Sequence, residues 1–457
     1  MADTNHLLSM RSYFETGVTR SYQFRKEQLT KLKKAVIENT VLLHEALYAD
    51  LKKSPEECWV TETGFLLAEV NNILKNLKEW MQEERVSTNL VNLPSKSYVM
   101  TEPLGVVLVI SPWNYPFQLL FTPLAGAIAA GNCVVLKPSE FAPATAAAMK
   151  KIINDTFEKQ YIQYIEGDGA TVIPALMNNF IFDHVFYTGS TTVGKIIYQM
   201  AASNLVPVTL ELGGKSPCIV ESDADITVAA KRIAVSKFSN AGQMCVTPDY
   251  LLVHISKKEA LVETFKITLS KFFGEDASQS YEYGRIINER QFDRLAAYLQ
   301  QGNILAGGRM DRSKLYIEPT LMDHVSLDSP MMNDEIFGPI LPIISFTNRE
   351  EAKAIIARHK NPLAFYVFTS SKTTEAEWLN TISFGGGCVN NASWHLTNHN
   401  LPFGGRGFSG SGNYHGKFSY DTFSHKKAVM KTPTWFDPAL KYPPFKGKLK
   451  LFKWVIK

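Results

Sequence analysis

The segment from Pro103 to Leu136 contains no charged side chain. A run of that length is either a membrane-spanning helix or the buried interior of a large fold. Its prolines and asparagines would break a single spanning helix, because each one interrupts backbone pairing or favours a turn: Pro112, Pro116, Pro123, Asn114 and Asn132. We therefore expect a buried strand, a loop, a helix and a second strand.

Short apolar runs and helical stretches alternate along most of the chain. Residues 104–110 are apolar and rich in β-branched residues, as in a strand buried on both faces. Helical periodicity fills the first eighty residues, and a second α/β run extends from about Pro217 to Gly387. Repeated β-α-β units predict parallel sheets with right-handed crossovers. The further strands and helices that we expect are 117–130, 133–136, 144–157, 161–165, 180–187, 206–212, 250–254 and 257–273.

Charge and cysteine usage limit the functional class. The formal net charge of +4 is too small to indicate nucleic-acid binding. The positive charge is concentrated in residues 441–457, which contain six lysines and no acidic residue. The five cysteines are scattered without a CxxC pair, which favours reduced thiols over a zinc site or a disulfide framework. The first residues carry no secretory signal pattern. We expect a cytoplasmic protein without a metal.

Two turns that contain glycine follow apolar strands. The run from Gly189 to Gly194 precedes a helical stretch, and helix N-termini in that position receive dinucleotide phosphates on backbone N–H groups. Its spacing is GxxxxG rather than GxGxxG, so an ordinary strand-to-helix turn fits equally well. Glu211 and Gly213-Gly214 lie at the end of another strand, where α/β folds place their sites, although a solvated turn is the plainer interpretation.

Cys245 and Asn114 are the remaining candidates for chemistry. Cys245 has small and polar neighbours, and a thiol near a helix N-terminus would have a lowered pKa and be nucleophilic; a plain structural role is equally consistent with these residues. Cys133 and Cys218 begin apolar runs and are expected in the core. Asn114 lies on a proline-flanked turn, from which its amide could donate to a developing oxyanion or simply satisfy the loop backbone.

Seven motifs occur in a fixed order along the chain: Pro112–Pro116, Lys137–Glu140, Tyr187–Ser190, Glu211–Pro217, Gly242–Cys245, Glu335–Pro339 and Pro402–Gly405. This series resembles the aldehyde dehydrogenase superfamily over nearly the whole chain, and the separation of Glu211 from Cys245 is also similar to the family's. Tyr115 and the tail Lys441-Tyr442-Pro443-Pro444 most resemble class 3, the branch with fatty and aromatic aldehyde dehydrogenases. The sequence departs from the family pattern at Tyr187 and at residues 406–408.

The resemblance implies NAD(P)-dependent oxidation of medium- or long-chain aliphatic or aromatic aldehydes to carboxylic acids. Cys245 would be the nucleophile that forms a thiohemiacetal and then a thioester, with Asn114 and the Cys245 N–H as oxyanion donors and Glu211 as the base that activates water. A carboxylate at Glu140 favours NAD over NADP, which class 3 enzymes also accept. The resemblance places Tyr115 and Phe403 in the substrate pocket, and it assigns cofactor contacts to Trp113, Lys137, Glu140, Gly189, Ser190, Gly194, Glu335 and Phe337.

Three alternatives remain open from the residues. A CoA-acylating aldehyde dehydrogenase would pass the thioester to CoA, but a base such as Glu211 serves water activation. A non-catalytic protein reusing the fold would be free to lose Cys245, Glu211 or Asn114, and all three are present. A thiol hydrolase would need a histidine placed to activate the cysteine; His184, near the glycine turn, is expected to cap or pack.

The resemblance also implies the domain organisation. We expect an α/β fold with a Rossmann-type NAD-binding domain (1–84 and 101–210), an α/β catalytic domain (211–415) and oligomerisation strands (85–100 and 421–433) that pair between the subunits of a homodimer. Residues 434–457 form a basic tail. Its aromatic residues and lysines suit an anionic membrane surface, but we favour an extended segment that packs on the partner subunit.

Overall fold

The uncharged segment forms two neighbouring parallel strands joined by a helix, as predicted. In the computed structural model, which describes residues 4–456, these are β3 (Val106–Ile110), α6 (Gln118–Ala130) and β4 (Cys133–Lys137). Every residue of the three elements is buried. Gly131 ends α6 with a φ of 90°, a left-handed conformation that suits glycine. The run is therefore the interior of a sheet rather than a span.

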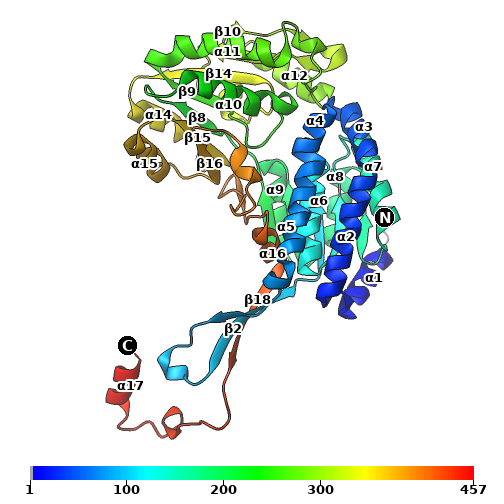
Figure 1. Cartoon of the computed structure of the whole chain (residues 1–457), viewed down its shortest axis with the longest axis vertical. Coiled ribbons are helices and arrows are strands. Elements are labelled where there is room, and N and C mark those ends of the chain that lie inside the picture. Colours follow the sequence, from blue (N-terminus) through cyan, green and yellow to red (C-terminus); the bar gives the residue numbers. More distant parts are fainter. Residues whose placement is uncertain (1–3, 457) are drawn as a thin grey trace.

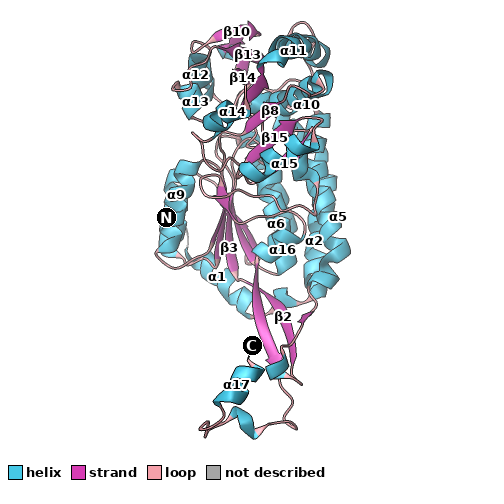
Figure 2. Ribbon diagram, turned by 90° about the vertical axis from the view of Figure 1, so that its left-hand side faces the viewer, coloured by secondary structure: helices cyan, strands magenta, loops and turns pink. Residues whose placement is uncertain are grey.

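β3 and β4 belong to a six-stranded sheet with the order β17-β7-β6-β3-β4-β5. Its strands are parallel apart from β17, which pairs antiparallel with β7. Helices cover both faces, with α9 on one side and α6, α2 and α5 on the other (Figure 2). The other strands of this sheet and further helices of this part of the fold are β5 (Ile162–Tyr164), β6 (His184–Thr188), β7 (Val208–Glu211), β17 (Gly410–Ser411), α7 (Pro143–Thr156), α8 (Gly169–Asn179), α9 (Thr191–Ala202) and α16 (Lys417–Thr422).

The helices of the first eighty residues pack along α6 and α7 (Figure 1). Ser54 caps the N-terminus of α4, and Pro55 occupies its first turn, where proline is tolerated. Between α4 and α5 the chain makes one wider π-helical turn, Trp59–Thr63. The helices are α1 (Thr4–Glu15), α2 (Tyr22–Glu38), α3 (Thr40–Leu51), α4 (Pro55–Cys58) and α5 (Gly64–Trp80).

A second, seven-stranded sheet has the order β10-β13-β14-β9-β8-β15-β16. It lies at the top of the molecule in the view of Figure 1, and its strands are parallel except for β10. Its elements are β8 (Pro217–Val220), α10 (Ile226–Phe238), β9 (Tyr250–His254), α11 (Lys258–Phe273), α12 (Glu289–Tyr298), β10 (Asn303–Ala306), β13 (Thr320–Asp323), α13 (Pro330–Asn333), β14 (Ile340–Phe346), α14 (Arg349–Ile356), β15 (Ala364–Phe368), α15 (Lys372–Thr381) and β16 (Gly386–Val389), with β11 (Met310–Asp311) and β12 (Tyr316–Ile317) as a separate pair.

A three-stranded antiparallel arm projects from the body (Figure 1). β1 (Glu84–Val86) and β18 (Ser424–Lys431) both pair with β2 (Lys96–Pro103), so segments from opposite ends of the chain meet there. The tail continues from β18 and ends in α17 (Leu449–Val455) beside the arm. No helix within residues 4–456 has the length and apolar character needed to cross a membrane.

The sequence predicted most elements to within a few residues, with two differences. The expected strand 180–187 starts later than predicted, because β6 begins at His184 and extends to Thr188. The reason is Asp183, whose carboxylate accepts a hydrogen bond from Val106 N at 2.7 Å and pairs with Arg11, which ends the ladder there. The second difference is the tail, where residues 449–455 form a helix instead of the extended segment that we favoured.

Candidate active site

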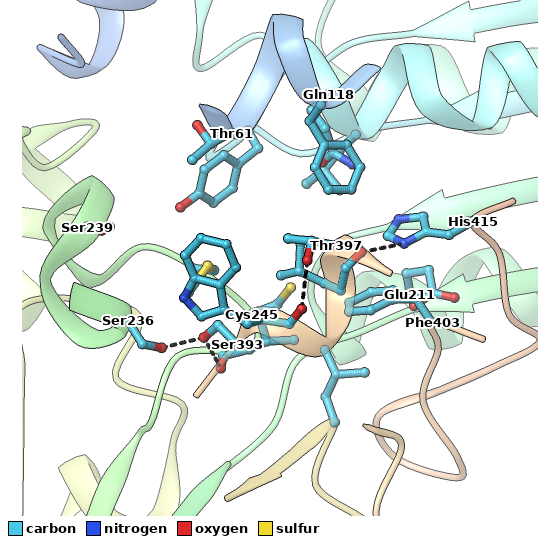
Figure 3. Close-up of a pocket in the computed structure, with 18 of the residues that line it drawn as sticks. Thr61, Gln118, Glu211, Ser236, Ser239, Cys245, Ser393, Thr397, Phe403 and His415 are labelled. Atoms are coloured by element: carbon cyan, nitrogen blue, oxygen red, sulfur yellow. Dashed lines mark hydrogen bonds between the residues drawn. The ribbon is translucent and has the colours of Figure 1, made fainter. Parts of the chain in front are cut away.

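A largely apolar pocket lies where β7 of the first sheet meets the loops of the second. Glu211, the last residue of β7, and Cys245, in the turn that follows the 3₁₀ turn Ser239–Gly242, both line it. Figure 3 shows Cys245 at the centre, with Glu211, Phe403 and His415 on one side and Ser236 and Ser239 on the other. The structure thus brings together two of the three residues to which the sequence assigned chemistry.

The carboxyl group of Glu211 is buried and unpaired. Its side chain contacts the pocket, and neither carboxyl oxygen has a hydrogen-bond partner among the described residues. Burial raises the pKa of Glu211 well above its usual value. Buried polar groups are nearly always paired, because an unpaired group loses its hydration without compensation. Such an exception in a pocket is typical of a group kept for function.

The thiol of Cys245 is half-buried between two carboxyl groups. Burial, together with the neighbouring carboxyls of Glu335 and Glu211, raises its pKa to about 12. The expectation of a lowered pKa is therefore wrong for the chain without ligands, because Cys245 lies in a turn and not at a helix N-terminus. The thiol is protonated at neutral pH in this state, and an added positive charge would be needed to ionise it.

We expect alkylation of Cys245 by iodoacetamide to accelerate about tenfold per pH unit from about pH 7 to pH 10 in the chain without cofactor. The reason is that the thiolate fraction rises in that proportion below a pKa near 12. Mass spectrometry of the labelled peptide measures the rate. Glu335→Gln should accelerate labelling above about pH 8, because it removes a negative charge that raises the thiol pKa. A rate that levels off below pH 8 would contradict this environment.

Asn114 lies against the turn that carries Cys245. Its side-chain amide donates to the carbonyl oxygen of Gln243 at 3.0 Å, two residues before Cys245. An amide carries two N–H donors, so one remains for another acceptor. The backbone carbonyl of Asn114 accepts from Lys53 Nζ at 2.9 Å and from the side-chain amide of Asn240 at 2.8 Å. This loop is therefore tied to two separate segments of the chain.

Several residues of this network were not singled out by the sequence analysis. Lys53 is buried and pairs with Glu62, while Glu57 accepts a hydrogen bond from the backbone N–H of Asn240 at 2.8 Å. In the sequence, Lys53 and Glu57 belong to the polar run 52–57, which is typical of a solvated helix start, and Glu62 follows within residues 59–63. No local pattern distinguishes them, because only the packing of α3 and α4 against residues 112–118 buries them.

The remaining walls of the pocket are mostly apolar. Tyr115 and Phe403, the two residues predicted for the substrate pocket, both line it. His415 is buried at one side, where burial lowers its pKa to about 4, so it is neutral at physiological pH. Among the described residues that line the pocket, Glu211 alone has an acidic side chain. Further apolar lining residues include Val60, Phe65, Leu119, Met244, Trp394 and Tyr414.

A second cavity of about 470 Å³ opens in front of α9. Thr191, the first residue of that helix, lines it together with Gly213, Gly214 and Glu335. The Glu335 carboxyl lies so close to Gly213 that a Cβ there would be 2.0 Å from Oε2. Burial raises the pKa of Glu335 to about 8. A helix N-terminus, a glycine pair and a carboxyl group around one cavity fit the phosphates and ribose hydroxyls of a dinucleotide.

The other predicted cofactor residues lie in the same region of the fold. Ser190 caps α9, and Gly194 packs so tightly that a Cβ would be 2.7 Å from the Leu212 side chain. The ring centroids of Trp113 and Phe337 are 5.3 Å apart. Lys137 and Glu140 follow β4: the lysine Nζ donates to the Glu140 carboxyl at 3.3 Å, and Gly169 N donates to its other oxygen at 3.0 Å. His184 packs instead, contacting Thr209.

Comparisons with known proteins agree on one family. A model of the aldehyde dehydrogenase family matches residues 9–429. The 4,4'-diaponeurosporen-aldehyde dehydrogenase of Staphylococcus aureus is 48% identical over 97% of this chain and 96% of its own, and a rat protein named "Aldehyde dehydrogenase, dimeric NADP-preferring" is 42% identical over 96% and 97%. A solved Staphylococcus aureus AldH in a substrate-bound state has a TM-score of 0.97 at 47% identity, covering 99% of both chains.

Proposed function

The chain belongs to the aldehyde dehydrogenase family, and we propose that Cys245, Glu211 and Asn114 carry out its NAD(P)-dependent oxidation of aldehydes to carboxylic acids. The observation that carries this assignment is the shared pocket, in which the Cys245 thiol and the unpaired carboxyl of Glu211 face an apolar space. NADH formation, assayed with short, medium, long-chain and aromatic aldehydes, tests it. A chain that oxidises none of them would overturn the proposal.

The first half-reaction uses Cys245 and the donors around it. The ionised thiol attacks the aldehyde carbon, and the aldehyde oxygen becomes an oxyanion. The free N–H of the Asn114 amide and the backbone N–H of Cys245 receive that charge, and in other enzymes the loss of one such donor costs about 2.7–4 kcal/mol of barrier stabilisation. When bound, the oxidised cofactor supplies a hydride acceptor and a positive charge. Collapse of the oxyanion re-forms the carbonyl and breaks the C–H bond of the former aldehyde carbon, which loses its hydrogen as hydride and remains as a thioester on Cys245.

The second half-reaction uses Glu211. Its buried oxygens have no other partner, so they are free to hold a water molecule and to accept its proton once the carboxyl is ionised. Attack of that water on the thioester releases the acid and restores the thiol. Transfer to CoA would not need this base, and product analysis with and without CoA separates the two reactions.

The proposed cofactor site extends from Glu335 to Glu140. Gly189, Ser190 and Gly194 shape the start of α9 for the diphosphate, while Trp113 and Phe337 lie where the nicotinamide end would bind. The Glu140 carboxyl, fixed by Lys137 and Gly169 N, suits free ribose hydroxyls and repels a 2′-phosphate. We therefore propose NAD as the preferred cofactor, with residues 1–84 and 101–210 as the NAD-binding domain and 211–415 as the catalytic domain.

An apolar pocket favours an apolar aldehyde. Burying hydrocarbon contributes about 25 cal/mol per Å², and among the described residues no lysine or arginine lines the walls to recognise an acidic substrate. Medium- or long-chain aliphatic and aromatic aldehydes are the proposed substrates. Free cysteines support a reducing compartment, and we propose the cytoplasm.

A homodimer is the proposed assembly. The arm leaves one edge of β18 unpaired, and apolar side chains are exposed on the arm and the tail, as is typical of a surface that a partner covers. We expect light scattering at micromolar concentration to give twice the chain mass of 51.2 kDa. A mass of one chain would refute the dimer. The exposed apolar residues of the arm and tail include Val86, Leu90, Leu93, Met430, Trp435, Phe436, Phe445, Leu449, Leu451, Trp454 and Ile456.

Residues 434–457 are proposed to pack on the partner subunit rather than on a membrane. We expect a chain that ends at Ala439 to dissociate at higher concentration than the full chain, because Leu449 and Trp454, 63% and 68% exposed in one chain, would lose their contacts. Sedimentation with anionic vesicles at low and high salt should leave both chains in the supernatant. Salt-sensitive vesicle binding by the full chain alone would instead support membrane contact.

A further inference from the structure

A fully buried ammonium group lies behind the loop that carries Asn114. Lys53, between α3 and α4, donates from Nζ to Glu62 Oε1 at 2.7 Å and to the carbonyl oxygen of Asn114 at 2.9 Å. Its Nζ also lies 3.8 Å from the centroid of the Tyr115 ring. The Lys53 ammonium thus has three partners, one for each of its N–H donors: a carboxylate, a carbonyl oxygen and the face of an aromatic ring. The side chains of Lys53 and Glu62 are 0% exposed.

Glu62 connects the same loop at its other end. It lies in the π-helical turn Trp59–Thr63, and its Oε2 accepts a hydrogen bond from the backbone N–H of Gln118 at 2.8 Å. Gln118 is the first residue of α6, so the carboxylate also satisfies the N-terminus of that helix. The Lys53–Glu62 pair therefore fixes both ends of the segment 114–118.

The carbonyl of Asn114 is the point through which this pair reaches the active site. The carbonyl accepts from both Lys53 and Asn240, which fixes the peptide plane beside its α-carbon. The side chain of the same residue donates to Gln243, in the segment that leads to Cys245. Rotation of this peptide would turn the amide away from the position of the oxyanion.

We propose that the Lys53–Glu62 pair is a positioning device for the oxyanion-binding amide of Asn114. The inference rests on the proposed function and names two residues outside the reacting centre. A buried ion pair is poor evidence of a role in stability alone, because apolar residues of similar volume often serve stability equally well. Apolar residues could not form hydrogen bonds with the Asn114 carbonyl oxygen or with the Gln118 N–H. They could therefore not fix the two ends of the segment 114–118.

A positioning role predicts a specific kinetic signature. Asn114 acts where charge develops, so loss of its alignment lowers kcat for oxidation while the KM for aldehyde and for NAD stays nearly constant. Alkylation of Cys245 by iodoacetamide forms no oxyanion. Its rate should therefore remain at the wild-type value, which a general collapse of the pocket would not allow.

The test uses the double variant Lys53→Met/Glu62→Gln, which removes both charges together and leaves neither buried alone. The matched control is Lys258→Met/Asp323→Asn, a pair of 2.9 Å at the far end of the second sheet. We expect the first variant to lower the burst rate of NADH formation about 10- to 100-fold, and the control to leave it unchanged. Thermal unfolding of both variants measures the change in stability.

A double-mutant cycle shows whether the pair acts through Asn114. Asn114→Ala alone should lower the burst rate about 100- to 1,000-fold, and adding Lys53→Met/Glu62→Gln should change it by less than about twofold more. If the charge-free variant does not fold, Lys53→Met alone carries the same cycle, because Glu62 keeps the Gln118 contact and burial raises the pKa of its carboxyl, which can then take a proton and stay neutral.

The outcomes separate this inference from the function on which it rests. A wild-type chain without aldehyde oxidation overturns both. An active wild type whose pair variant keeps its burst rate overturns the positioning role alone. Additive losses in the cycle, or an equal fall in the alkylation rate, also overturn it, because the pair would then act on the pocket as a whole and not on Asn114.

Discussion

Cys245→Ala is expected to abolish aldehyde oxidation, with a loss of about four orders of magnitude or more in kcat. Alanine carries no nucleophile, so neither the thiohemiacetal nor the thioester can form. The side chain is only half-buried in a turn, and removing one sulfur leaves the surrounding backbone in place. Steady-state NADH formation measures the loss, and NAD titration followed by protein fluorescence measures cofactor binding, which should persist.

Cys388 provides the matched control. It is the other half-buried cysteine, and its sulfur lies 3.6 Å from Nδ1 of His395, outside the pocket that holds Glu211. Cys388→Ala should retain near wild-type turnover. Near wild-type turnover by Cys245→Ala would overturn the covalent mechanism, whereas loss of activity in both variants would point to a role for thiols outside this pocket.

Glu211→Gln is expected to slow the second half-reaction far more than the first. Glutamine has the shape of the carboxyl side chain but cannot accept the proton of water, and general base catalysis contributes about 10²–10⁴-fold. A rapid burst of NADH should be followed by turnover reduced in about that proportion. Mass spectrometry of quenched enzyme should then detect an acyl group on Cys245.

The opposite kinetic pattern would give Glu211 another role. If the burst is lost and no acyl-enzyme accumulates, Glu211 acts before hydride transfer, for example by ionising the nearby thiol, whose pKa it influences. Glu259→Gln, at an exposed position on α11, is the control for a glutamate-to-glutamine change and should leave both phases unaltered.

The fold was predictable where burial follows from the local pattern. The uncharged run 103–136 predicts two strands and a helix, because that arrangement buries the apolar chain and accommodates its four prolines in or beside turns and near a helix start. The order of strands in each sheet was not predictable, since it depends on which helices pack on which face. Nor was the start of β6 at His184, which depends on the carboxylate of Asp183, a residue that accepts a hydrogen bond from a strand in another part of the chain.

The site was predictable to the extent that its residues carry a motif. Glu211 and Cys245 occur in ordered motifs, and the structure places both in one pocket. The pKa of Cys245 was mispredicted because it is raised first by burial and then by carboxyls from distant segments, neither of which the local sequence shows. Lys53 and Glu62 could not be distinguished from surface charges, because their burial exists only once the N-terminal helices dock on α6.

The pairing of β17 with β7 has a consequence for synthesis of the chain on the ribosome. Gly410 pairs with Glu211, so the strand that carries this carboxyl gains its outer neighbour only after the chain has been made as far as residue 410. The arm depends in the same way on β18 pairing with β2. Contacts between such distant segments form slowly. We therefore expect the pocket wall around Glu211 to be completed late in folding, after the segment that carries Gly410 has been made.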